Sequence, residues 1–103
     1  MEQIDRIKLM EQHLDRSSQA VMRLSAALDD YAAVRAAICE LSNYYGSEEW
    51  KKDFSDDEQG RLPKDLKRGV LSEDGIWNLL SDCRTLNTRM QEVVKESKDV
   101  PQR

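Results

Sequence analysis

The residues most suited to chemistry lie in one stretch, "RLPKDLKRGVLSEDG", which covers positions 61–75. Lys67 and Arg68 precede Ser72, a residue type that often caps the start of a helix. The free N–H groups after such a cap could bind an anion, assisted by the two cations. The two acidic residues after Ser72 oppose this, because they place carboxylates where the anion would sit. The stretch also lacks the glycines of a phosphate-binding loop. We interpret it as a structural corner, with an anion site at Lys67, Arg68 and Ser72 as the alternative.

A second group of candidate residues is the acidic segment "DFSDDE". Asp53, Asp56 and Asp57 would share one face of a helix, and three carboxylates could bind a divalent cation. Their spacing is not that of an EF-hand loop, which needs acids at alternate positions and a glycine at the sixth. We therefore predict no metal site. We expect a solvated acidic face, partly neutralised by nearby cations: Arg61, Lys64, Lys67 and Arg68.

Nucleophilic catalysis would have to use His13, the only histidine of the chain. No serine or cysteine is placed by the sequence to partner it, so we expect a surface or interface histidine. We predict no catalytic residue and no cofactor, and hence a protein that is not an enzyme.

The aromatic residues allow two interpretations. Trp50, Phe54 and Trp77 could line a small-molecule pocket, but aromatics at helical spacing more often pack in a core, which we prefer. Tyr44 and Tyr45 are adjacent, so both cannot easily face inward on a helix. At least one of their hydroxyls should reach solvent or a hydrogen-bond partner.

The composition indicates long amphipathic helices in one domain. Of 103 residues, 35% are charged, and there are only four glycines and two prolines. A net charge of −4 argues against a nucleic-acid partner, and the absence of a long apolar run argues against a membrane. We expect a cytoplasmic protein. Cys39 and Cys83 lie 44 residues apart, and we expect both to be buried free thiols.

Apolar residues recur mostly at steps of three and four through the first 45 residues and predict one long helix over about 2–44. Serines at 17 and 18 make a break there possible. This apolar stripe consists of Ile7, Met10, Leu14, Val21, Leu24, Leu28, Tyr31 and Ile38.

Helix signals divide the rest of the chain. Gly46 should end the first helix and Ser47 should cap a short helix over about 48–58. A connecting corner over 60–71 then leads to a last helix over about 73–96, followed by a frayed tail at 97–103. Leu71 and Ile76 stand where a hydrophobic staple places its two side chains around the Ser72 cap.

The predicted fold is all-α, with two long antiparallel helices forming a coiled-coil-like hairpin and a short third helix near the turn. The last helix is long enough to cover only about half of the first. The uncovered half, roughly Ile4 to Val21, still carries apolar residues. It could fold back near Ser17 or pair with another chain. We favour a homodimer through this N-terminal half, and an antiparallel pair is the simplest closed arrangement.

Residues 44–80 resemble a small bacterial family known only as a domain of unknown function. The resemblance rests on "YYGSEEW", an Asp shortly after it, and "LPKDLKRGVLSEDGIWNLL". It implies an all-α bacterial protein. It implies no activity, substrate or cofactor.

The function that these observations favour is a non-enzymatic, self-associating protein-interaction module. A partner surface at the corner would use Tyr44, Tyr45, Trp50, Lys67 and Arg68. The alternative is a regulatory protein that binds a small ligand or an anion at residues 67–74.

Overall fold

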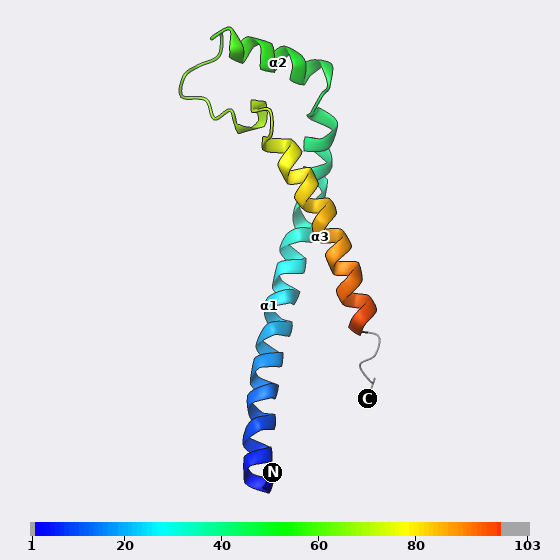
Figure 1. The fold of residues 1–103 in the computed structure, drawn as a ribbon. Helices are drawn as coiled ribbons and strands as arrows, with labels where there is room; N and C mark the ends of the chain where they lie inside the picture. Colours follow the sequence, from blue (N-terminus) through cyan, green and yellow to red (C-terminus); the bar gives the residue numbers. More distant parts are fainter. Residues whose placement is uncertain (1, 98–103) are drawn as a thin grey trace. The chain divides into compact units, whose positions relative to one another are not determined.

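The computed structural model describes residues 2–97 and is all-α over that range. It contains three α-helices and one short 3-10 helix, with no strand among the described residues (Figure 1). Contacts within the chain divide it into two compact units between Ala37 and Ile38, and each unit is described by itself. No helix in the described part of the chain combines the length and the apolar character needed to cross a membrane.

The first helix, α1, spans Gln3–Tyr44 without interruption (Figure 1). It begins one residue later than predicted, within the usual uncertainty of a helix end. Ser17 and Ser18 lie inside the helix, so the possible break between them does not occur. The neighbouring leucine and alanine residues are strong helix formers and offset the weak preference of serine.

The N-terminal unit consists of α1 alone, and its apolar stripe is exposed. Each of Ile4, Ile7, Met10, Leu14 and Val21 has more than half of its surface accessible, from 51% for Met10 to 68% for Val21. Within this unit, no second element covers the apolar face of the helix.

The second helix, α2, spans Glu48–Glu58, the same bounds as predicted. Gly46 precedes it with a φ of +79°, a left-handed conformation that glycine adopts without steric cost. Ser47 caps the helix as predicted, because its hydroxyl accepts a hydrogen bond from the Trp50 N–H at 3.1 Å. At the other end, the N–H groups of Gly60 and Arg61 bond to the carbonyls of α2 in a Schellman motif, with Gly60 at a φ of +71°.

The corner is more regular than predicted. Residues Gly69–Leu71 form a 3-10 helix, η1, within the segment that was expected only to connect two helices. The last helix, α3, spans Gly75–Ser97 and so begins two residues later than predicted. The reason is that the Leu71 and Ser72 N–H groups close the turns of η1, which delays the α-helical ladder. Ser97 belongs to α3, and the rest of the predicted tail, 98–103, lies outside the described residues.

The core of the described chain is small and lies where η1 meets α3. Leu71 and Ile76 are its two buried hydrophobic residues, at 6% and 3% exposure, and they are the pair predicted as the staple. Two predictions of burial are wrong. Trp77 is 53% exposed, because its neighbour Ile76 takes the inner face of α3. Cys39 is exposed for the same reason beside Ile38, while Cys83 is half-buried, and both are free thiols.

Candidate functional site

An aromatic cluster joins the end of α1 to α2. The rings of Tyr45 and Trp50 meet edge to face with centroids 5.1 Å apart, and Trp50 stacks on Phe54 at the same separation. The Trp50 indole N–H also donates to the carbonyl of Val70 at 2.9 Å. These half-buried aromatic residues therefore link the segment that follows α1 to α2 and η1, but Trp50 and Phe54 are not buried in the core.

Both adjacent tyrosines are half-buried and both hydroxyls donate hydrogen bonds. Tyr44 donates to the Asp53 carboxylate at 2.6 Å, and Tyr45 donates to the backbone carbonyl of Glu73 at 3.2 Å. Burial, then the bond to Asp53 and its negative charge, raise the pKa of Tyr44 to about 12. The hydroxyl of Tyr44 therefore stays protonated, and it serves as a hydrogen-bond donor rather than as a base at neutral pH.

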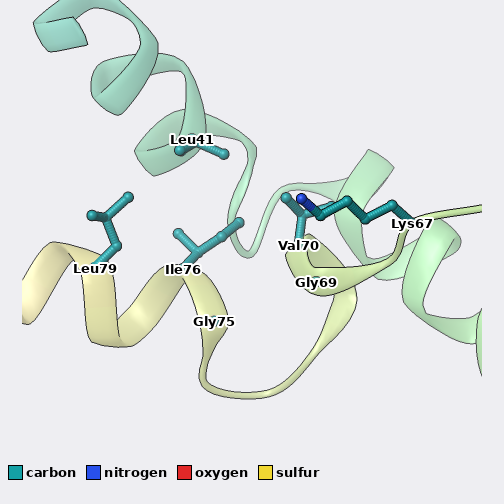
Figure 2. A pocket seen from close by; sticks show the side chains of 7 residues that line it. All are labelled: Leu41, Lys67, Gly69, Val70, Gly75, Ile76 and Leu79. Carbon is teal, nitrogen blue, oxygen red and sulfur yellow. The ribbon is translucent and has the colours of Figure 1, made fainter.

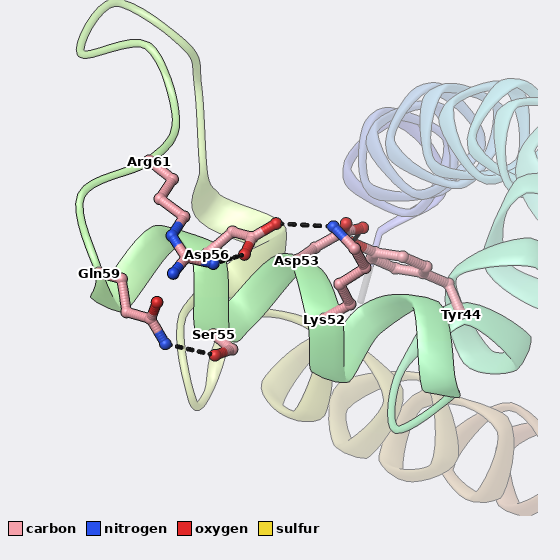
Figure 3. A network of polar contacts seen from close by, with 7 residues as sticks. All are labelled: Tyr44, Lys52, Asp53, Ser55, Asp56, Gln59 and Arg61. Atoms are coloured by element: carbon pink, nitrogen blue, oxygen red, sulfur yellow. Dashed lines mark hydrogen bonds and ion pairs between the residues drawn. The ribbon is translucent and has the colours of Figure 1, made fainter.

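The acidic face of α2 is occupied by contacts within the corner (Figure 3). Asp56 accepts a hydrogen bond from Lys52 at 2.9 Å and lies 3.4 Å from Arg61. The bond from Lys52 is the main cause that lowers the pKa of Asp56. Asp57 pairs with Arg68 at 2.7 Å. Because each carboxylate faces a different partner, the described residues hold no group of three that could bind a metal ion.

The three residues of the alternative anion site do not converge. Arg68 turns toward Asp57 on α2, in agreement with the predicted neutralisation of the acidic segment. The Ser72 hydroxyl accepts from the Gly75 N–H at 3.0 Å and donates to the Gly69 carbonyl at 2.7 Å. Lys67 is exposed and forms no ion pair with another described side chain. Of this trio, Lys67 alone is available to a ligand.

A cavity of about 480 Å³ opens beside Lys67 (Figure 2). Apart from Lys67, its lining is made of glycines and aliphatic side chains: Leu41, Gly69, Val70, Gly75, Ile76 and Leu79. These residues could not be assigned to one cavity from the sequence, because the cavity joins segments that are far apart in the chain. The signal that could have pointed to it is the apolar pair Ile76 and Leu79 at the start of a helix.

Gly75 is required by close packing inside the corner. A Cβ atom at this position would lie 2.5 Å from the Gly69 carbonyl oxygen and 2.6 Å from the Ser72 hydroxyl. Neither Gly69 nor Gly46 faces such an obstacle. The glycine therefore lets the chain turn tightly from η1 into α3.

The five residues of the predicted partner surface all belong to the unit that begins at Ile38, and four of them make contacts within it. Tyr44 and Tyr45 donate hydrogen bonds, Trp50 bonds to Val70, and Arg68 pairs with Asp57. In the N-terminal unit, His13 is exposed and shares a shallow depression with Arg16, Ser17 and Ala20. No carboxylate lines that depression with it.

One protein family matches the chain. The model of the family described as Domain of unknown function (DUF4298) matches residues 7–93, well over half of the chain, and these include residues 44–80. The match confirms the resemblance to an uncharacterised family. No curated protein and no solved structure matches the chain significantly.

Proposed function

The chain belongs to the DUF4298 family, and we propose that it is a non-enzymatic helical interaction module that forms a homodimer through the N-terminal half of α1. The observation that carries this proposal is the exposed apolar stripe of the N-terminal unit. Ile7, Met10 and Leu14 follow one another at steps of three and four on an unbroken helix. Such a stripe normally packs against another helix.

The length of α3 limits how much of α1 it can cover. We propose that α1 and α3 form an antiparallel hairpin in which α3 packs along α1. This packing begins at Leu41 and Ile76, which line the same cavity. The 23 residues of α3 extend about 35 Å at 1.5 Å per residue. Counted back from Leu41, its last residue then reaches the level of about residue 20 of α1. Residues 3–20 need a different partner.

A second copy of the chain is the partner that the apolar stripe fits. Two identical stripes can cover each other completely, and a closed symmetric dimer leaves no stripe exposed. Burying one large aliphatic side chain contributes about 1.5–3 kcal/mol. Several such residues per chain offset the entropy lost when two chains associate.

The contacts of the corner support the non-enzymatic part of the proposal. Three of the polar groups that could act as acid, base or nucleophile there, those of Tyr44, Asp57 and Ser72, are engaged in structural hydrogen bonds. A general base needs a free, tuned group within reach of a substrate.

Light scattering behind size exclusion tests the dimer. We expect a mass twice the 11.9 kDa of the chain over a wide concentration range. Leu14→Glu should shift the mass to that of one chain, because it places a charge in the interface. Gln12→Glu, which adds the same charge on the opposite face of α1, should stay dimeric. A wild-type mass of one chain at every concentration would contradict the proposal.

A second candidate function is suggested by the cavity beside Lys67. One cation at the rim of an apolar depression suits a small molecule with an anionic group and an apolar body. A medium-chain carboxylate should then raise the melting temperature, and inorganic phosphate should not. Lys67→Ala should abolish this shift, and Lys64→Ala should preserve it, because Lys64 does not line the cavity. No shift with the carboxylate would exclude this candidate.

A further inference from the structure

The spacing along α1 defines a heptad repeat. The step from Ile7 to Met10 is three residues and the step from Met10 to Leu14 is four, which assigns Ile7 to position a and Met10 to position d. Leu14 and Val21 are the next a residues. Because α1 is continuous, these residues stay on one face of the helix over residues 3–21.

We propose that two copies of α1 pair in parallel and in register over residues 3–21, an inference that rests on the self-association proposed above. The parallel direction differs from the antiparallel pair that the sequence suggested as the simplest closed arrangement. Two independent features favour it: the charges that flank the stripe, and the shapes of the residues within it.

The flanking charges match only in the parallel arrangement. Arg6 occupies position g and Glu11 position e, and in a parallel pair each g residue lies beside the e residue five positions later in the partner. Arg6 of each chain then meets Glu11 of the other, which gives two ion pairs. Both side chains are exposed, and neither forms an ion pair with another described residue.

An antiparallel pair cannot form these contacts. There, e residues face e residues and g residues face g residues, so Arg6 never meets Glu11. In the antiparallel register that stacks Met10 on Leu14 of the second copy, Glu11 faces Glu11. Two like charges at that position repel, and no ion pair replaces them.

The residues of the stripe also favour a parallel two-stranded coil. β-Branched Ile or Val at a together with Leu, which has no β-branch, at d is typical of parallel dimers. Ile7 and Val21 are β-branched at a, and Met10 at d has no β-branch. Leu14 at a and the polar residues Gln3 and Ser17 at d depart from this pattern. Ser17 at d specifies the register, because only the in-register pair places its hydroxyl opposite a second hydroxyl.

Cysteine cross-linking distinguishes a parallel from an antiparallel arrangement of the two α1 helices. In a Cys39→Ser/Cys83→Ala background, Gln3→Cys places a thiol at position d near the start of α1. A parallel pair brings the two thiols together, and oxidation in a redox buffer should link the dimer within minutes. In the antiparallel register above, the thiols lie about 27 Å apart, at 1.5 Å per residue. Gln12→Cys, on the outer face, is the matched control and should stay unlinked.

A charge-swap cycle tests the ion pairs. Arg6→Glu and Glu11→Arg should each raise the dimer Kd by roughly tenfold or more, because two attractive contacts become two repulsive ones. The double variant Arg6→Glu/Glu11→Arg restores opposite charges across the interface and should return the Kd to within about threefold of the wild type.

The outcomes separate this inference from the proposed function. A dimer that cross-links at position 3 and is rescued by the double swap supports parallel pairing. A dimer that neither cross-links there nor shows the rescue overturns the parallel direction and leaves the proposed homodimer in place. A mass of one chain at every concentration overturns both.

Discussion

The two units of this chain are stabilised in different ways, although α1 runs through both. The N-terminal unit, residues 3–37, shows a regular apolar stripe that is exposed. The corner unit, from residue 38 to 97, buries two hydrophobic side chains and adds directional contacts around Trp50, Tyr44 and Arg68. The corner thus satisfies its own groups, and the N-terminal stripe does not. Because aliphatic side chains offer no directional contacts, the choice of partner for the apolar stripe depends on the shapes of its side chains and on the charges beside it.

The largest effect should come from shortening one large apolar side chain in each of the two units. Ile76→Ala should lower the free energy of unfolding by about 2–4 kcal/mol at any protein concentration, because Ile76 is buried within its own chain. Leu14→Ala should have little effect in dilute protein, where the residue is exposed, and a growing effect as the concentration rises. Urea unfolding at several concentrations measures both. If Leu14→Ala lowers the free energy of unfolding equally at every protein concentration, Leu14 is not buried by association, and the proposed difference between the two units is wrong.

A smaller effect is expected from the close packing at Gly75. Gly75→Ala should destabilise the corner by about 1–3 kcal/mol, because its Cβ would overlap the Gly69 carbonyl and the Ser72 hydroxyl. Gly69→Ala is the matched control, since no atom lies within 4 Å of the Cβ it adds. Thermal unfolding followed by circular dichroism compares the two. Equal melting temperatures for both variants would show that the tight turn is not needed.

The raised pKa of Tyr44 predicts how the stability of the chain depends on pH in the alkaline range. The pKa of Tyr44 is raised to about 12 by burial and by Asp53, so the folded chain keeps this proton after the unfolded chain has lost it. The contribution of the protonated Tyr44 hydroxyl to the free energy of unfolding is fully present below pH 10 and is lost as the pH rises toward 12. Tyr44→Phe should cost about 1–2 kcal/mol at neutral pH and should flatten the decline in stability over this alkaline window. Unfolding curves of both proteins between pH 8 and 12 measure the difference; parallel curves would contradict it.

The smallest effect is expected for the ion pair between Arg68 and Asp57. The two side chains are about one third and one quarter exposed, so their coupling should be about 0.5–1 kcal/mol and should fall with added salt. A double-mutant cycle with Arg68→Ala and Asp57→Ala isolates this coupling. Lys67→Ala serves as the control and should change stability by less than about 0.5 kcal/mol. A coupling free energy near zero at low salt would show that the ion pair between Arg68 and Asp57 does not contribute to stability.

The three α-helices and most of their ends could be predicted from the sequence because their causes are local, but η1 and the later start of α3 were not predicted. The apolar period indicated α1 and α3, and the Ser47 cap indicated the start of α2. The staple also predicted the two buried residues, Leu71 and Ile76. Each of these features depends on residues within a few positions of one another, where backbone hydrogen bonds and side-chain caps act.

Only the tertiary structure decided which distant groups meet. Arg68 pairs with Asp57 rather than joining Ser72 in an anion site, and Trp50 reaches the carbonyl of Val70. The cavity beside Lys67 and the need for glycine at position 75 follow from the same folding of α1, η1 and α3 around the corner. The obstacles at Gly75 lie three and six positions away, whereas the ion pair, the bond of Trp50 and the cavity lining join positions 11 to 38 residues apart in the chain. No local preference encodes such distances; the burial of Leu71 and Ile76 brings the segments together and thereby selects the partners.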